Sequence, residues 1–330
     1  MTQKTITILI TLALFTGMLA ACTPKATTPG ESEQAKIPEA APAETSEAIL
    51  TWEPITLTDD LERQVSLVSQ PQRVVSLAPS NTEMLFALGA VDQVVGRDEF
   101  SDYPPETVEL QSVGGGWGEY NMEAIIALNP DLVLAAEINT PEQVQALEEL
   151  GLTVFMLGNP TDLEGMYDNL MTVAILTGHV EEANNLITSL KERVADVLAT
   201  VATSQERPSV FYELDASDPN IPWTAGPGTF IDILINMAGG KNIGAMLEGA
   251  WAQISIEALV EQDPDIILLG DSAYGITPEM IVERAGWESL SAVLNNLVYP
   301  FDDDLVSRPG PRLVDGLETL AELLHPELFK

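Results

Sequence analysis

The chain contains two copies of one short pattern, and this repeat limits its fold more than any other feature. The first copy is residues 122–134 (MEAIIALNPDLVL) and the second is residues 256–268 (IEALVEQDPDIIL), so they lie 134 residues apart. Each copy predicts a helix, a connection through Asn-Pro-Asp or Asp-Pro-Asp, and a buried strand. Strands alternate with helices around both copies, which is typical of a parallel sheet covered on both faces. We therefore predict an α/β protein with two equivalent lobes.

A single long helix is predicted between the two copies, over residues 180–202. Its apolar residues are Val180, Ala183, Leu186, Ile187, Leu190, Val194, Val197, Leu198 and Val201. Steps of three and four place them in one stripe along a helix about 34 Å long. Taken alone, this stretch fits a surface helix on a single globule equally well. The repeat on either side favours a brace between two lobes.

Composition excludes several classes of protein. The 330 residues include 51 acidic and 14 basic ones, giving a net charge of −37, which argues against binding to nucleic-acid phosphates. One cysteine and two histidines cannot supply a disulfide framework and supply few ligands for a metal or a cofactor. The sequence has no P-loop, His-Glu-x-x-His or Gly-x-Ser-x-Gly motif. We therefore expect no enzymatic activity and no cofactor.

The N-terminus has the features of a secretory signal. Lys4 precedes an apolar run over residues 6–20, which is too short to span a bilayer comfortably. The run ends in Leu-Ala-Ala-Cys22, which resembles the lipobox of bacterial lipoproteins and implies cleavage before Cys22 and acylation of that residue. Residues 23–48 are rich in Pro, Ala, Thr and Glu, which predicts a disordered tether. The alternative is an ordinary signal peptide with an incidental cysteine.

The predicted organisation of the whole chain follows from these features. Its five parts are a signal peptide (1–21), a lipidated cysteine with a tether (22–50), an N-terminal α/β lobe (51–160), connecting helices (161–204) and a C-terminal α/β lobe (205–330). We expect the protein in the cell envelope, outside the cytoplasm and anchored by its N-terminal lipid.

Two tryptophans occupy matching positions in the two halves. Trp117 and Trp251 follow glycine-containing segments, and each precedes a glutamate, Glu123 or Glu257, by six residues. An indole on such a loop can lie flat against a planar ligand in a cleft between the lobes. The alternative for each tryptophan is packing in the core. Both glutamates fall in the first turn of a predicted helix, where spacing alone indicates only favourable interaction with the helix dipole.

Five motifs together resemble a known family. They are residues 73–83 (RVVSLAPSNTE), residues 96–105 (GRDEFSDYPP), Trp117 with Glu123, residues 251–257 (WAQISIE) and residues 308–312 (RPGPR). In this order they resemble the periplasmic-binding-protein-like solute receptors of ABC importers for cobalamin, haem and iron–siderophores. The resemblance extends over residues 55–329, and the cobalamin-binding members match best.

This resemblance implies a fold and a set of ligand contacts. The fold is that of a class III periplasmic binding protein, with two Rossmann-like lobes joined by one long helix and a ligand held between them. The resemblance implies that Phe100, Trp117 and Trp251 pack on a corrin ring, and that Asp304 and Arg308 meet its polar edge. Phe100 departs from the pattern, because the cobalamin receptor usually has tyrosine there.

The resemblance also implies partners. Glu123 and Glu257, one in each lobe, would dock onto arginines of the permease. We accordingly predict a monomeric substrate-binding lipoprotein that captures cobalamin or cobinamide and delivers it to an ABC permease with its ATPase subunits. Alternatives are a haem or ferric-siderophore receptor of the same fold and, more remotely, a ligand-sensing lipoprotein or an enzyme that acts in the cleft.

Some residues near the expected cleft bear on these alternatives. Tyr103 and Tyr120 are candidate haem ligands, although Tyr103 belongs to an Asp-Tyr-Pro-Pro turn with an expected structural role. The obvious cations for an anionic siderophore are Arg97, Arg308 and Arg312, of which Arg312 is expected to cap a helix. Ser80 and Glu83 have capping-box spacing, which predicts that they begin a helix.

Overall fold

The chain divides into two units, Met1–Leu50 and Thr51–Lys330, and the second contains the folded lobes. The computed structural model describes residues 52–116 and 119–329. The predicted signal peptide, Cys22, the tether and Trp117 lie outside these described residues. Within them, no helix is long and apolar enough to cross a membrane.

The N-terminal lobe is built on a five-stranded parallel sheet in the order β5-β4-β3-β6-β7. These strands are β3 (Val74–Ser76), β4 (Val94–Arg97), β5 (Gln111–Ser112), β6 (Leu132–Ala136) and β7 (Val154–Leu157). An antiparallel pair, β1 (Ile55–Thr58) and β2 (Gln64–Leu67), precedes them. The helices are α1 (Pro79–Ala87), α2 (Met122–Ala127), α3 (Pro141–Glu149) and α4 (Leu163–Thr177). Strands β3, β6 and β7 are buried along their whole length, as expected for a sheet covered on both faces.

The C-terminal lobe is built on a four-stranded parallel sheet in the order β10-β8-β12-β13. These strands are β8 (Ser209–Glu213), β10 (Lys241–Asn242), β12 (Ile266–Leu269) and β13 (Val298–Pro300). A separate antiparallel pair consists of β9 (Trp223–Ala225) and β11 (Trp251–Gln253). The helices are α6 (Phe230–Met237), α7 (Ile256–Gln262), α8 (Pro278–Val282), α9 (Ser291–Leu294), α10 (Asp304–Ser307) and α11 (Leu313–Leu324).

Four strands of the first sheet match the four strands of the second, which confirms the predicted α/β fold with two related lobes. Strands β4, β3, β6 and β7 of the first sheet correspond in order to β10, β8, β12 and β13 of the second. The sequence repeat falls on α2 with β6 and on α7 with β12.

The repeated Asn-Pro-Asp and Asp-Pro-Asp segments do the same structural work in each lobe. Asn129 and Asp263 follow the helices in the left-handed backbone region, at φ 46° and 45°. Two positions later, Asp131 accepts hydrogen bonds at 2.8 and 2.9 Å from the backbone N–H groups of Gln72 and Arg73, just before β3. Asp265 accepts one at 2.8 Å from the N–H of Ser209, the first residue of β8. The carboxylate therefore satisfies donors at the start of the central strand in both lobes.

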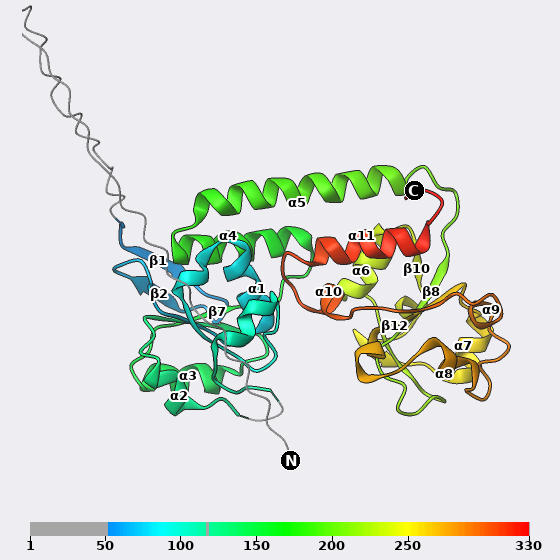
Figure 1. Ribbon diagram of the computed structural model, residues 1–330, viewed down its shortest axis with the longest axis horizontal. Coiled ribbons are helices and arrows are strands. Elements are labelled where there is room, and N and C mark those ends of the chain that lie inside the picture. The colour runs from blue at the N-terminus through cyan, green and yellow to red at the C-terminus, as the bar shows by residue number, and fades with distance from the viewer. Residues whose placement is uncertain (1–51, 117–118, 330) are drawn as a thin grey trace, which may run out of the picture. The chain divides into compact units, whose positions relative to one another are not determined.

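Helix α5 (Val180–Val201) ends one residue before the predicted boundary and packs on a helix of each lobe. Figure 1 shows it lying along α4 of the first lobe and α11 of the second. Its buried residues Ala183, Leu190 and Val197 belong to one hydrophobic core that includes residues of both sheets. Arg193 on α5 also forms ion pairs with Asp315 and Glu318 of α11. The helix is therefore packed against both lobes.

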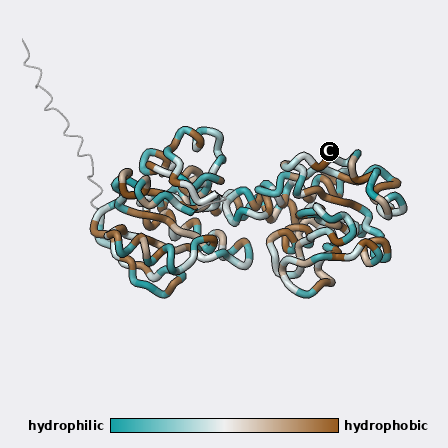
Figure 2. The backbone as a smooth tube through the Cα atoms, turned by 90° about the horizontal axis from the view of Figure 1, so that it is seen from below, coloured by the Kyte–Doolittle hydropathy of each residue, from teal (hydrophilic) through white to brown (hydrophobic). Residues whose placement is uncertain are grey.

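Each lobe also has a smaller core of its own on the far face of its sheet. Figure 2 shows hydrophobic stretches of the chain running through the interior of both lobes. The sheets therefore form rigid supports whose connecting loops can carry functional side chains.

Candidate ligand-binding cleft

A pocket of about 590 Å³ lies where loops of both lobes meet. Its residues follow the carboxyl ends of β3, β4, β6, β7, β12 and β13, which is where α/β sheets usually bind ligands. The described residues that line it are Ala78, Pro79, Ser80, Phe100, Gly115, Gly116, Tyr120, Ala136, Ile138, Gln143 and Asn159 of the first lobe, with Tyr274, Asp304, Ser307, Arg308 and Pro309 of the second. The connections at the carboxyl ends of both sheets thus form the pocket.

The pocket combines exposed rings with neutral polar groups. The side chains of Phe100 and Tyr274 are 39% and 81% exposed, although aromatic residues of this size are usually buried further. Hydroxyl and amide side chains make up most of the polar lining, namely Ser80, Tyr120, Gln143, Asn159, Tyr274 and Ser307. Among the described lining residues, Asp304 and Arg308 are the charged ones. They pair with each other at 2.8 Å.

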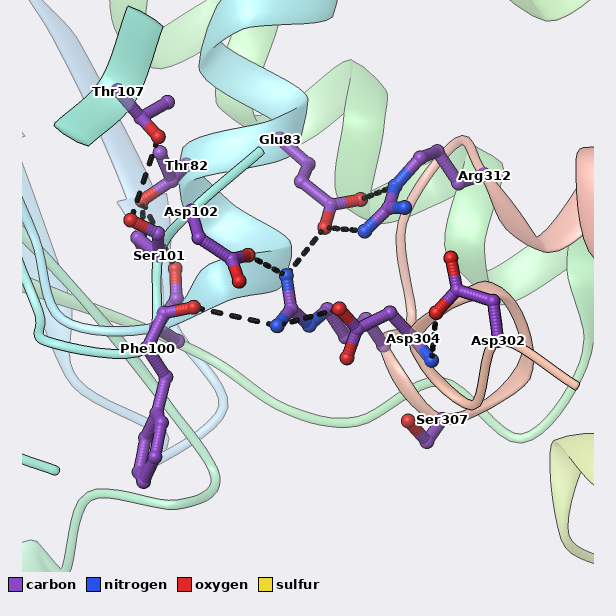
Figure 3. A network of polar contacts seen from close by, with 12 residues as sticks. Thr82, Glu83, Phe100, Ser101, Asp102, Thr107, Asp302, Asp304, Ser307 and Arg312 are labelled. Carbon is purple, nitrogen blue, oxygen red and sulfur yellow. Dashed lines mark hydrogen bonds and ion pairs between the residues drawn. The ribbon is translucent and has the colours of Figure 1, made fainter. Parts of the chain in front are cut away.

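Arg308 also forms contacts across the cleft. Its Nη1 donates to Asp102 Oδ1 at 2.7 Å and to Glu83 Oε1 at 3.3 Å. Its Nη2 donates to the backbone oxygen of Phe100 at 3.4 Å. Figure 3 shows Glu83 of α1, Phe100 and Asp102 of the loop after β4, and Asp304 of α10 in one network of polar contacts. Arg308 therefore binds three partners in the opposite lobe in addition to Asp304.

Glu83 and Arg312 form a second, buried connection between the lobes. Arg312 Nε and Nη2 donate to the two oxygens of Glu83 at 2.9 and 2.6 Å. The residues are 3% and 9% exposed, and Arg312 also lies 4.0 Å from the ring centre of Tyr103. A two-pronged pairing of this kind satisfies both charged groups in a fixed geometry.

The capping roles predicted for these residues are wrong. Helix α1 begins at Pro79 after Ala78, and no side chain caps it. Arg312 precedes α11 without donating a capping hydrogen bond. Both side chains instead pair with each other, because a buried carboxylate and a buried guanidinium need a charged partner more than a helix end needs a side chain.

Burial changes the acidity of two carboxyl groups at the cleft. It raises the pKa of Asp304 to about 6, against the opposite effect of Arg308. Burial also raises the pKa of Asp98, while a hydrogen bond from the Ser101 hydroxyl and the positive charge of Arg308 oppose this shift. Asp98 accepts a hydrogen bond at 2.9 Å from the backbone N–H of Phe100 and is itself fully buried. Asp98 therefore holds the loop that carries the Phe100 ring.

The structure brings together some of the predicted ligand contacts and separates one. Phe100, Asp304 and Arg308 line the pocket. Trp251 lies on β11, is 55% exposed and is absent from the described lining. The matching Trp117 is outside the described residues. The matching positions of the two tryptophans predicted that both contact a ligand in the cleft. The structure instead places Trp251 on the exposed strand β11, outside the described lining of this pocket.

Sequence reasoning missed Tyr274, which is the most exposed aromatic ring of the pocket. It follows β12 by five residues in Gly-Asp-Ser-Ala-Tyr, so an aromatic residue shortly after the carboxyl end of a central strand was the available signal. The two tyrosines considered as haem ligands have other roles. The Tyr120 hydroxyl donates to Leu77 O at 2.7 Å and accepts from Asn139 at 2.8 Å, and burial raises its pKa to about 12. Tyr103 stacks on Arg312.

Glu123 and Glu257 occupy equivalent exposed positions. Each lies in the first turn of its helix, α2 or α7. A side chain caps the start of each helix, Asn121 for α2 and Ser255 for α7. Either a dipole role or a partner contact is possible from these positions. Across the described residues, no group of three His, Cys, Asp or Glu side chains could hold a metal ion.

Comparisons with known proteins place the chain in a family. A family model described as periplasmic binding protein matches residues 74–305, which is more than half of the chain. An uncharacterized ABC transporter substrate-binding lipoprotein of Bacillus subtilis is 36% identical over 282 residues, covering 84% of this chain and 87% of the relative. A cobalamin-binding protein of Halobacterium salinarum is 32% identical over 279 residues, covering 82% and 74%.

Solved structures agree with this assignment. The vitamin B12-binding protein of Vibrio cholerae superposes with a TM-score of 0.65 at 29% identity, covering 79% of this chain and 98% of that one. A haem-binding protein of Roseiflexus superposes with a TM-score of 0.70 at 26% identity, covering 78% and 99%. The chain belongs to the periplasmic binding protein family, so the predicted resemblance is confirmed. The name of the Bacillus subtilis relative describes it as a substrate-binding lipoprotein of an ABC transporter.

Proposed function

Because the chain belongs to this family, we propose that it is the substrate-binding lipoprotein of an ABC importer and that it carries a corrinoid, cobalamin or cobinamide. The relatives named as ABC transporter and cobalamin-binding proteins support the importer role and the corrinoid. The haem-binding structural neighbour has the same fold, so the ligand class has to be argued from the chemistry of the cleft.

The observation that carries the corrinoid assignment is the neutral polar lining of the pocket. A corrin ring has broad apolar faces and a fringe of amide side chains. Phe100 and Tyr274 offer rings for such faces, while Gln143, Asn159 and Ser307 can exchange hydrogen bonds with amides. The charges of Asp304 and Arg308 offset each other at 2.8 Å. Haem has two carboxylates and many ferric siderophores are anionic, so both would need a surplus of cationic groups.

We assign roles to the predicted site residues on this basis. Phe100 and Tyr274 pack on the ring from the two lobes, and Asp304 and Arg308 receive amide groups at its edge. Trp117 and Trp251 remain proposed ring contacts. Trp251 is 55% exposed and lies outside the described lining of the pocket, so its contribution has to be measured separately from that of the lining rings.

Isothermal titration of the purified folded part with dicyanocobinamide, cyanocobalamin, haemin and ferric enterobactin, an anionic ferric siderophore, tests the assignment. We expect at least one corrinoid to bind at least 100-fold more tightly than haemin or ferric enterobactin. Tighter binding of haemin would contradict it. In the same titration, Phe100→Ala should weaken corrinoid binding at least tenfold, because truncation of an aromatic anchor removes its packing surface. Trp251→Ala should also weaken it more than tenfold if the indole contacts the ring.

One observation favours haem as the second candidate. Tyr274 presents a phenol in the pocket with its side chain 81% exposed, and haem receptors of this family often use a tyrosine ligand. If haemin binds, Tyr274→Phe should shift its absorbance bands, since the phenol oxygen would be lost as an iron ligand. Unchanged haemin spectra in this variant would remove Tyr274 from that role.

We also propose the anchor and the partners that the sequence indicates. Cys22 carries the lipid, the protein acts as a monomer, and Glu123 and Glu257 dock onto the permease. Mass spectrometry of the mature protein should find an acylated Cys22 at the N-terminus. An unmodified Cys22 or an uncleaved leader would contradict the lipoprotein assignment.

A further inference from the structure

Asp102 differs from the other carboxylates that surround Arg308. Glu83 is buried and already bound through both of its oxygens by Arg312. Asp304 is the first residue of α10, and Arg308 directly follows that helix, four residues later in the same lobe. Asp102 comes from the opposite lobe, its side chain is 60% exposed, and it forms the shortest of the hydrogen bonds between Arg308 and the N-terminal lobe, at 2.7 Å.

The exposed position of Asp102 argues against a role in holding the fold. Surface ion pairs typically contribute only about 0–1 kcal/mol to stability. The buried pair between Glu83 and Arg312 already joins the same two lobes. The Asp102 carboxylate therefore acts chiefly on the electrostatic potential of the cleft beside Arg308.

The formal charges of the network show the sign of this electrostatic effect on a ligand. Arg308 and Arg312 contribute two positive charges, and Glu83, Asp102 and Asp304 contribute three negative ones when ionised, so the network has a surplus of one negative charge. Among the described residues, the contacts of Arg308 use both of its Nη groups, which leaves Nε–H for a ligand acceptor. An amide at the ligand edge can accept there and donate to a carboxylate. A ligand carboxylate at the same place brings another negative charge beside Asp102 and Asp304, and like charges at such distances repel.

We propose that Asp102 is a specificity-determining residue, which withholds Arg308 from anionic ligands and so makes the cleft selective for ligands with neutral amide edges. The inference rests on the proposed function, because the selected edge is that of a corrinoid. It assigns Asp102 an action through Arg308, so that replacing Asp102 alters the ranking of ligands and not the ability to bind one.

Two corrins that differ only in their side chains test this inference. Cobyrinic acid heptaamide and cobyrinic acid, both as dicyano complexes, have the same ring with amide or carboxylate edges. Fluorescence titration should give at least a 100-fold preference of the native protein for the amide. Asp102→Asn should reduce that preference at least tenfold, mainly by tighter binding of the acid, and the gain should shrink as salt rises.

Three variants serve as controls. Asp196→Asn removes the same charge from an exposed position on α5, so it should leave the preference unchanged within twofold. Asp102→Glu should restore selectivity, because the carboxylate returns. Asp102→Ser gives a second neutral side chain if the asparagine variant is poorly folded, as judged by its thermal unfolding.

The outcomes separate this inference from the proposed function. If Asp102→Asn and Asp102→Ser bind the heptaamide and keep the native preference within twofold, the inference is overturned. If the native protein binds neither corrin, the corrinoid assignment fails. Haemin and haemin dimethyl ester then replace the corrins as the anionic and neutral probes. Asp102→Asn should again improve binding of the anionic probe relative to the neutral one.

Discussion

The two lobes share one sheet architecture, yet in the ion pairs that join them each lobe contributes a different sign of charge. The N-terminal lobe contributes the carboxylates of Glu83 and Asp102, and the C-terminal lobe contributes the guanidinium groups of Arg308 and Arg312. The residues repeated between the lobes, such as Asp131 and Asp265, build each lobe from within. Residues that join the lobes and shape the site are not repeated. Duplication therefore accounts for the scaffold, and divergence between the copies accounts for the cleft.

A buried pair in the C-terminal lobe makes the contrast clearer. Arg284 donates through Nη1 and Nη2 to Glu213 at 2.5 and 2.9 Å, and its guanidinium lies 4.8 Å from the Trp287 ring centre. All of these residues belong to one lobe. The Glu83–Arg312 pair has the same two-pronged geometry but joins the lobes. Substitutions in the two pairs should therefore affect stability alike and ligand binding differently.

The largest effect is expected from Glu83→Ala. This variant leaves Arg312 buried without its carboxylate, and breaking such a pair typically costs about 3–5 kcal/mol. Urea denaturation should show this loss in the free energy of unfolding, and corrinoid affinity should also fall because the lobes lose their buried connection. The double variant Glu83→Met with Arg312→Leu should recover much of the stability. A loss below about 1 kcal/mol for Glu83→Ala would contradict a structural role for the pair.

The second prediction concerns the pH dependence of the pair within one lobe. Burial raises the pKa of Glu213 from 4.5 to about 7, while Arg284 opposes the shift. Between pH 4.5 and 7 the folded protein keeps the Glu213 proton that the unfolded chain releases. The contribution of Glu213 to the free energy of unfolding is therefore fully present below pH 4.5 and is lost as the pH rises through 7. The free energy of unfolding of the native protein, minus that of Glu213→Gln, should fall by on the order of 2 kcal/mol between these values.

Urea denaturation at half-unit steps from pH 4.5 to 8 gives this difference directly. Groups that do not interact with Glu213 titrate equally in both proteins and cancel in the subtraction. Asp271, which interacts with Glu213, is replaced by asparagine in both proteins. A difference that rises with pH would show that Arg284 keeps Glu213 ionised in the folded protein, and the predicted direction would then be wrong.

The sequence predicted the lobes well because the interactions that form them recur at a fixed spacing. Asn129 and Asp263 end their helices and Asp131 and Asp265 follow two positions later, so a repeated string reports a repeated contact. Glu83 shows the limit of such reasoning. Its spacing from Ser80 predicted a capping box, but its partner Arg312 is 229 residues away, and no local pattern reports that contact.

The cleft was predicted only in part for the same reason. Resemblance to a family identified Phe100, Asp304 and Arg308, which line the pocket, whereas Tyr274 lies in no quoted motif and was missed. Symmetry also suggested that Trp251 lines the cleft, but the antiparallel pairing of β11 with β9 places this residue outside the described lining. Such pairing depends on the whole lobe and leaves little trace in local spacing.

A third prediction tests whether the lobes are equivalent as structures. Asp131→Ala and Asp265→Ala each remove a carboxylate that accepts backbone hydrogen bonds before or at a central strand, at an expected cost of about 1–2 kcal/mol. The residues share no partner, so the double variant should lose the sum of the two within about 0.5 kcal/mol. Urea denaturation measures all three values. A cost confined to one lobe would show that the repeated carboxylate has lost its role in the other.

The smallest effect on stability is expected for Glu123 and Glu257, which occupy equivalent exposed positions in the two lobes. The Glu123→Ala, Glu257→Ala double variant changes two exposed side chains, so stability should change by less than about 0.5 kcal/mol and corrinoid affinity should be unaltered. Uptake of labelled cobalamin by cells that carry the permease should nevertheless fall at least tenfold. Charged pairs at a transient interface set orientation and association rate, and the proposed docking needs one pair from each lobe.

Glu142 and Glu279 provide a matched control for this experiment. They are exposed glutamates in the first turns of α3 and α8, so replacing both by alanine removes the same charge from the same kind of position, one in each lobe. If both double variants transport equally well, the docking role is lost and the dipole role suffices. If both fail equally, uptake depends on the overall negative charge of the surface. Only loss of uptake specific to Glu123 and Glu257 would mean that the duplicated lobes present a duplicated contact to the permease.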